Sequence, residues 1–229
     1  MARISDYAVI GDCHTVALVG RDASIDWWCP ERFDSPSVFA RLLDPDAGHC
    51  SIRIDGQSSS SRAYVQDTNV LTTTLSNTDG DLEVTDCMPV AAFDPTRPAA
   101  VDAAHCILRR LRCLSGHVEV HVEVVVRPDY ARAEPDAAQT GLVSATATHP
   151  LSATDHGYRA TWTLSAGESA WLRIDGPAAT AEPVAPHDAA DALAVAICHV
   201  HSQAPARVAG VMGAAPRKAP ASWRQYRVR

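Results

Sequence analysis

The stretch HVEVHVEVVV (residues 117–126) alternates apolar and polar side chains at every second position. In an extended chain the valines from Val118 to Val124 share one face, and the histidines and glutamates share the other. This alternation is typical of an antiparallel strand with one face packed on a core and the other face in water. It therefore predicts a half-buried strand.

Similar segments lie on both sides of this strand. The preceding segment HCILRRLRCL (105–114) is separated from it by only Ser115-Gly116, so we interpret the two as a hairpin. Further strand pairs are expected at 14–20 with 24–29, at 63–66 and 69–76 with 81–87, and at 158–166 with 168–175 around Gly167. Many short strands with almost no helical pattern favour an all-β fold, an antiparallel β-sandwich.

Two segments depart from this β pattern. One short early helix is expected, because Ser35 suits its cap, Pro36 suits its first position and SVFARLL (37–43) has helical apolar spacing. After residue 178 the chain becomes rich in Ala, Pro and Val. We expect one domain over 1–178 and a tail over 179–229 that is partly helical or disordered, with a helix at 187–201.

Composition limits the classes of partner. The chain has 229 residues and a net charge of −7, with no basic block, which argues against nucleic acid and anionic membranes as partners. No apolar run approaches the ~20 residues of a membrane helix, and the first residues lack a secretory signal pattern. The seven cysteines are odd in number and show no CxxC spacing, so we expect reduced thiols and a cytoplasmic location.

Metal and cofactor motifs are weak. His117, Glu119 and His121 share one strand face, and imidazole with carboxylate at this spacing can bind zinc or nickel. A solvated sheet face explains the same pattern, and no further ligand is identifiable, so we expect no metal and no cofactor. The GxSxG, GxxxxGK[ST] and GxGxxG patterns are absent.

Carboxylates are candidates for sugar chemistry. Asp26, Asp34 and Asp86 lie beside apolar or aromatic residues, where loss of water can raise the pKa of a catalytic acid. Aspartates in β-proteins also cap turns or pair with arginine. The residues alone leave both interpretations open.

The stretch GDCHTVALVGRDASIDWWCPERFDSPSVFARLL (11–43) resembles the opening of the N-terminal domain of glycoside hydrolase family 15, the glucoamylase and trehalase group. Segments 63–89, 109–132 and 164–174 resemble later parts of that domain, so the resemblance covers about residues 1–176. The matching positions in the opening are Ile4, Asp6, Tyr7, Ile10, Gly11, Asp12, Thr15, Ala17, Leu18, Val19, Asp22, Ser24 through Trp27, Cys29, Arg32 through Pro36, Phe39, Ala40, Leu42 and Leu43. The departures are Ala23, Trp28, Glu31 and Cys87.

This resemblance implies a β-sandwich of the supersandwich type that accompanies an (α/α)6 barrel. In the family the barrel carries two catalytic glutamates, which hydrolyse α-glucosidic bonds with inversion. None of the residues here resembles that barrel, so we expect no catalytic residue in this chain and no activity alone. An α-glucoside or trehalose would be bound only with a barrel, from a partner chain for example. An uncovered barrel-facing surface would favour self-association. The resemblance fits both a trehalase and a glucoamylase as the full-length protein to which this domain corresponds.

The same resemblance marks residues that face substrate or barrel: Asp26, Trp27, Trp28, Arg32, Phe33 and Asp34. Adjacent strand residues point to opposite faces, so one tryptophan should be buried and the other exposed unless something covers it. Arg32 and Asp34 are expected either to form a buried pair that fixes the loop or to bind sugar hydroxyls. The alternative function is a stand-alone carbohydrate-binding sandwich.

Overall fold

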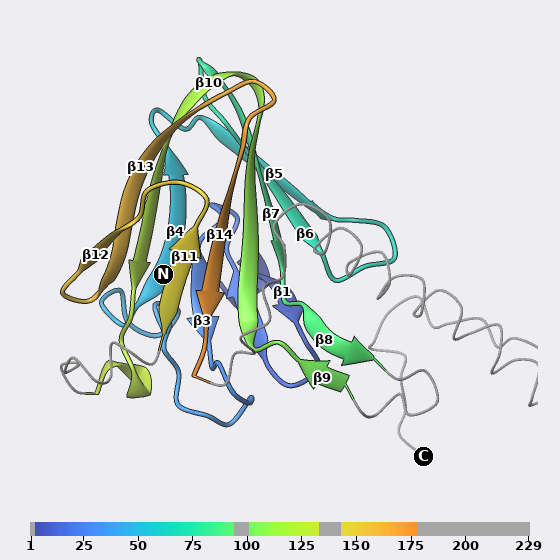
Figure 1. Cartoon of the computed structure of the whole chain (residues 1–229), viewed down its shortest axis with the longest axis vertical. Helices are drawn as coiled ribbons and strands as arrows, with labels where there is room; N and C mark the ends of the chain where they lie inside the picture. Colours follow the sequence, from blue (N-terminus) through green and yellow to red (C-terminus); the bar gives the residue numbers. More distant parts are fainter. Residues whose placement is uncertain (1–2, 94–100, 133–142, 178–229) are drawn as a thin grey trace, which may run out of the picture.

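The computed structural model describes residues 3–93, 101–132 and 143–177. These residues form an antiparallel β-sandwich, which confirms the expected fold class (Figure 1). The expected tail over 179–229, with its helix at 187–201, lies outside the described residues.

The first sheet has the strand order β1-β2-β3-β4-β10-β13-β12. Its strands are β1 (Ala8–Gly11), β2 (Val16–Val19), β3 (Ile25–Trp28), β4 (His49–Ile54), the second half of β10 (Cys106–Val125), β13 (Gly157–Ser165) and β12 (Ser152–Thr154). The expected pairing of 14–20 with 24–29 is confirmed as β2 with β3.

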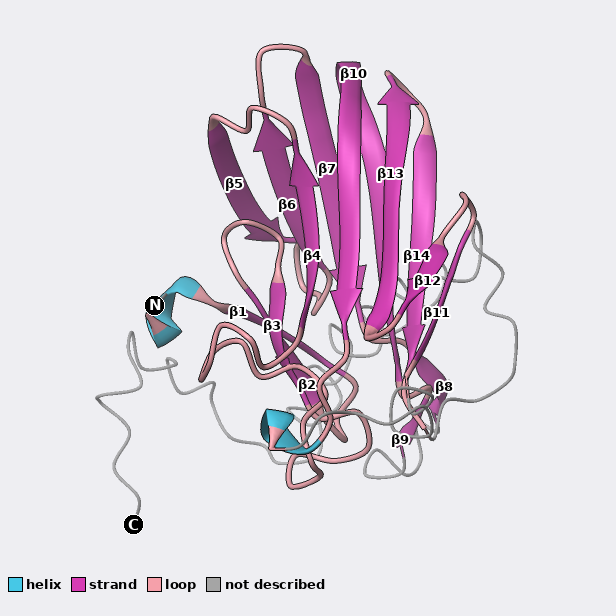
Figure 2. Ribbon diagram, turned by 90° about the vertical axis from the view of Figure 1, so that its left-hand side faces the viewer, coloured by secondary structure: helices cyan, strands magenta, loops and turns pink. Residues whose placement is uncertain are grey.

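The second sheet has the order β5-β6-β7-β10-β14-β11. Its strands are β5 (Ser59–Tyr64), β6 (Leu71–Ser76), β7 (Gly80–Cys87), the first half of β10, β14 (Ser169–Asp175) and β11 (Ser144–Ala147). The expected pairing of 69–76 with 81–87 is confirmed as β6 with β7, whereas the strand expected at 63–66 overlaps only the end of β5, which pairs with β6. A separate ribbon joins β8 (Val90–Phe93) to β9 (Val101–Ala103), and Figure 2 places it beyond one end of the sandwich.

The expected hairpin of residues 105–114 with 117–126 is wrong, because both segments belong to the single strand β10. Its first half pairs with β7 and β14, and its second half pairs with β4 and β13. The strand passes from one sheet to the other over the upper edge of the sandwich in Figure 1. The expected pairing of 158–166 with 168–175, which are β13 and β14, is also wrong. Each of these strands hydrogen-bonds to a different half of β10.

The bend in β10 has a local cause. Buried positions are odd-numbered at Leu111 and Cys113 but even-numbered from Val118 onward, so the face that meets the core changes between them. A β-bulge between Cys113 and Ser115 supplies the extra residue that this change requires. Gly116 then adopts φ 65°, a conformation that favours glycine. Both halves of β10 can therefore direct their apolar side chains into the same core.

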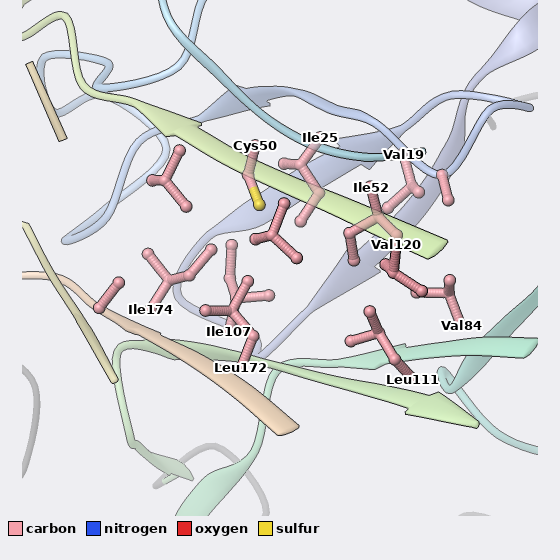
Figure 3. Packing of buried hydrophobic residues seen from close by; sticks show 14 of the residues in the cluster. Val19, Ile25, Cys50, Ile52, Val84, Ile107, Leu111, Val120, Leu172 and Ile174 are labelled. Atoms are coloured by element: carbon pink, nitrogen blue, oxygen red, sulfur yellow. The ribbon is translucent and has the colours of Figure 1, made fainter. Parts of the chain in front are cut away.

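The core lies between the two sheets, as Figure 3 shows. Each fully buried aliphatic side chain stabilises the fold by about 1.5–3 kcal/mol. The first sheet contributes Val19, Ile25, Cys50, Ile52 and Val120, and the second contributes Val84, Ile107, Leu111, Leu172 and Ile174.

The expected early helix at 37–43 is also wrong. Phe39 forms an isolated bridge with Trp28, and their amides and carbonyls exchange hydrogen bonds of 3.0 and 3.4 Å. These bonds occupy backbone groups that a helix would need, and the bridge seats the Phe39 ring against Trp28 in the core. A turn follows at 41–43. The helical elements among the described residues are the short η1 (Ile4–Asp6) and η2 (Asp129–Ala131).

Candidate functional site

The loop that follows β3 (residues 29–43) is held to the sheet by Asp26. The Asp26 carboxylate accepts hydrogen bonds from the Tyr7 hydroxyl at 2.8 Å, from the Ser24 hydroxyl at 2.6 Å and from Arg41 Nε at 2.9 Å. Burial, and then the bond to Asp26, raises the pKa of Tyr7 above its ordinary value, so the hydroxyl remains a donor. Asp26 is therefore buried and engaged with three side chains, which is the arrangement of a structural carboxylate.

The paired tryptophans face opposite sides of β3, as the strand geometry predicts. Trp28 is fully buried, with its ring centroid 5.9 Å from that of Phe39. Trp27 is half-buried on the outer face, and its ring lies 6.0 Å from the ring of Tyr130. Trp28 thus belongs to the core, and Trp27 is the tryptophan that a ligand or a partner can reach.

Tyr130 completes this aromatic surface, and sequence reasoning missed it. Asp129, Tyr130 and Ala131 all have positive φ angles, of 51°, 59° and 56°, so η2 is a left-handed turn. Each such non-glycine residue costs of order 1–3 kcal/mol. The turn seats Tyr130 against Trp27 and places the Arg132 guanidinium 5.3 Å from the Tyr130 ring. The segment contains no glycine, so its residue types do not predict the left-handed turn.

The tip of the loop carries exposed charged and apolar side chains. Arg32 Nε lies 3.0 Å from the Asp34 carboxylate, but both side chains are about three-quarters exposed, at 74% and 75%. Arg32 and Asp34 therefore do form a pair, but the expectation that this pair is buried is wrong. Phe33 between them is 61% exposed. The Tyr130 hydroxyl donates to the Ser35 carbonyl at 3.4 Å, which ties this tip to the aromatic pair.

The remaining sequence candidates separate into structural and surface groups. Asp86 is fully buried in an ion pair with Arg109. On the outer face of the first sheet, Glu119 and His121 meet Asp55, which follows β4, whereas His117 is exposed and does not join them. Asp55 could not be predicted as a member of this group, because only the pairing of β4 with β10 brings it beside His121.

A hollow of about 340 Å³ lies beside His121 on the same face, lined by Arg53, Glu123, Arg159 and Thr161 among others. The hydrogen bond from Arg159, at 2.8 Å, lowers the pKa of Glu123. Burial lowers the pKa of the neighbouring His49, whose Nε2 lies 3.4 Å from Glu123. Among the described residues that line the hollow, Glu123 is the one acidic side chain. An inverting glycosidase needs two carboxyls roughly 6.5–9.5 Å apart, so the lining of this hollow does not provide the required pair.

The fold and these surfaces define an antiparallel β-sandwich domain whose exposed features are an aromatic surface beside the 29–43 loop and a charged outer face on the first sheet. The chain belongs to the family described as "Trehalase-like, N-terminal", which it matches over residues 1–171.

Several trehalases are similar to this chain. It is 36% identical over 139 residues to a trehalase of Mycolicibacterium smegmatis. The aligned region makes up 56% of this chain and 21% of that protein. It is 34% identical over 139 residues to a trehalase of Mycobacterium tuberculosis, covering 56% of this chain and 20% of that protein. Trehalase 1 of Sulfolobus acidocaldarius is 45% identical over 82 residues, or 35% of this chain and 14% of that protein. The matched region thus spans about a fifth or less of these relatives. In the part of the chain that the structure describes, no helix has the length and apolar character to cross a membrane.

Proposed function

We propose that this chain serves as the N-terminal β-sandwich domain of a trehalase- or glucoamylase-type hydrolase of glycoside hydrolase family 15. In this proposal an (α/α)6 barrel supplies the two catalytic glutamates, one protonating the leaving oxygen and one activating water. The chain by itself binds no α-glucoside productively and has no hydrolytic activity. The match to the trehalase-like N-terminal family over residues 1–171 carries the proposal. The structural role of Asp26 and Asp86 supports the assignment of catalysis to another segment.

The contact with the barrel is assigned to the 29–43 loop and its neighbour Tyr130. Phe33 and Leu43 are 61% and 57% exposed, which is a large apolar area to leave in water. Arg32 and Asp34 flank Phe33 and can make polar contacts around it. This combination of an apolar centre with a charged rim is typical of protein interfaces.

The purified chain tests the first half of the proposal. Incubated with trehalose, maltose or soluble starch, it should release no more glucose than a heat-inactivated sample. Release above that background would contradict the assignment of catalysis to a barrel.

A chimera tests the second half. In the M. smegmatis trehalase, the aligned segment is replaced by the corresponding segment of this chain. We expect the chimera to hydrolyse trehalose, and a version with Phe33→Glu and Leu43→Glu to lose activity or solubility. A soluble, folded chimera without activity would argue that this sandwich does not serve such a barrel.

Direct carbohydrate binding by the sandwich is the second candidate, favoured by the stacking surface of Trp27 and Tyr130. Calorimetric titration with maltooligosaccharides should then give heat at millimolar ligand, and Trp27→Ala should abolish it. Trp28→Ala is unsuitable for this test because Trp28 lies in the core. Absence of heat from the unmodified chain removes this candidate.

We also propose that the protein works in the cytoplasm. Cys29, Cys50, Cys106 and Cys113 are buried free thiols. Burial raises the pKa of the Cys29 thiol to about 11 and that of Cys106 to about 12, so both remain protonated and unreactive at neutral pH. Fractionation of the native cells, with the protein found in the membrane or secreted fraction, would contradict this location.

A further inference from the structure

Three side chains that bind metals in other proteins converge on the outer face of the first sheet. His121 and Glu119 come from β10, and Asp55 comes from the turn after β4. His121 Nε2 lies 2.9 Å from Asp55 Oδ1 and 3.5 Å from Glu119 Oε1. One ligand atom from each residue lies within 4.8 Å of the other two. The pairing of β4 with β10 therefore assembles one nitrogen and two oxygens at a single point.

Thr161, a residue outside this group, orients the imidazole. His121 Nδ1 lies 3.2 Å from the Thr161 hydroxyl on the neighbouring strand β13. When Nδ1 carries the proton and donates it to Thr161, the lone pair of Nε2 points at the two carboxylates. Metal-binding histidines are commonly fixed through their second nitrogen in this way.

Three acceptors that face one another repel unless a cation lies between them. In the neutral tautomer described above, the Nε2 lone pair and two carboxylates provide such a set, with two negative charges. A hydrogen on Nε2 that is donated to Asp55 is one way to remove this repulsion, and a metal ion bound by all three side chains is the other. The adjoining hollow of about 340 Å³ has room for the water molecules that complete a metal's coordination.

We propose that Asp55, Glu119 and His121 bind a divalent transition-metal ion, with Zn²⁺ as the representative. An imidazole nitrogen with two carboxylate oxygens suits Zn²⁺, Co²⁺ or Ni²⁺ better than Ca²⁺ or Mg²⁺, which prefer all-oxygen sites. The site is independent of the proposed hydrolase role, since it lies on the outer face of the first sheet and shares no residue with the 29–43 loop.

The test is calorimetric titration of ZnCl₂ into the full chain after chelator treatment and desalting at neutral pH. We expect His121→Ala to weaken the tightest zinc-binding step at least tenfold. Thr161→Val should weaken it by about tenfold, because removal of an orienting partner typically costs 10–100-fold in affinity. His117→Ala is the matched control, since it removes an exposed histidine from the same strand face without touching the cluster, and it should leave that step unchanged.

Glu119→Gln keeps the shape of the side chain and should leave the fold intact, and circular dichroism verifies the fold of each protein. It should also weaken the tightest step, and the visible absorption of bound Co²⁺ should change in the same variants. The proposal is overturned if the unmodified chain shows no zinc binding. It is equally overturned if folded His121→Ala and Glu119→Gln bind zinc as tightly as the unmodified chain, or if His117→Ala weakens binding as much as they do.

Discussion

Arg109 of β10 and Asp86 of β7 form a bidentate ion pair inside the sandwich, with both side chains fully buried. The guanidinium Nε and Nη2 donate to the two carboxylate oxygens at 2.7 and 3.0 Å. The guanidinium also donates to the carbonyl of Cys50 in β4 and to the carbonyl of Ala23 in the turn before β3. Burial opposes the charge on Arg109, but the interactions with Asp86 and Cys50 together outweigh this effect and raise the pKa of Arg109. The pair thus links β7 and β10 to backbone of the opposing sheet.

Removal of either partner of this ion pair should strongly destabilise the protein. Asp86→Asn or Arg109→Met leaves a buried charge or donor without its partner, so we expect a loss of about 3–5 kcal/mol in the free energy of unfolding. Urea denaturation followed by tryptophan fluorescence measures it. The double variant Arg109→Met with Asp86→Leu should recover part of this loss, and a double variant no more stable than the single ones would contradict the desolvation argument.

The two tryptophans of β3 should respond differently to truncation. Trp28→Ala opens a cavity in the core and should destabilise the fold by about 3–5 kcal/mol. Trp27→Ala removes a half-buried ring from the outer face and should cost less than half as much. Thermal melting of both variants checks this order, and equal losses would be inconsistent with the core position of Trp28.

Gly116 should not tolerate a side chain. It has φ 65°, and a Cβ atom there would lie 1.8 Å from the Asp79 carbonyl oxygen, so Gly116→Ala must distort the bend in β10. Gly56 is the matched control, with φ 62° and no atom within 4 Å of an added Cβ. Gly56→Ala should cost only the left-handed strain of about 1–2 kcal/mol. Chemical denaturation that finds the two variants equally stable would show that the close approach is unimportant.

Stability should fall below neutral pH in part through His49. Burial lowers the folded-state pKa of His49 below its ordinary value, so the unfolded chain binds a proton more readily than the folded chain. The contribution is present above about pH 6.5, the unfolded value, and is lost as the pH falls toward the folded pKa. Glu123, whose pKa is lowered by Arg159, adds a loss of the same sign at more acidic pH.

The measurement is the urea midpoint of the unmodified chain and of His49→Gln between pH 7.5 and 5. We expect a shallower decline in the variant over this range, because a glutamine does not titrate. Parallel curves for the two proteins would assign the decline to other groups.

The exposed apolar side chains at the 29–43 loop should drive self-association. Phe33 and Leu43 are the candidates, and Phe33→Glu with Leu43→Glu should lower the fraction of oligomer at high concentration. Size-exclusion chromatography with light scattering measures the mass. Leu114→Glu, an equally apolar exposed position at the bend of β10, is the control and should leave the oligomer fraction unchanged. A strictly monomeric unmodified chain would refute the expectation.

The sequence by itself determined the class of fold and most strand positions. Period-two patterns such as that of residues 117–126 depend on which side of one strand meets the core, which is a local property of the chain. The same local rule correctly predicted that Trp27 and Trp28 face opposite ways, although it did not say which one is buried.

Tertiary structure alone decided how the two halves of β10 pair with other strands and which site residues meet. Both halves of β10 had hairpin-like spacing, but packing sends them into opposing sheets, where each buries its valines or leucines in one shared core. Tyr130 reaches Trp27, and Asp55 reaches His121, through contacts between segments 103 and 66 positions apart in the sequence (130 − 27 and 121 − 55). Such contacts arise from strand order and backbone conformation, which the residue pattern of a single segment does not encode.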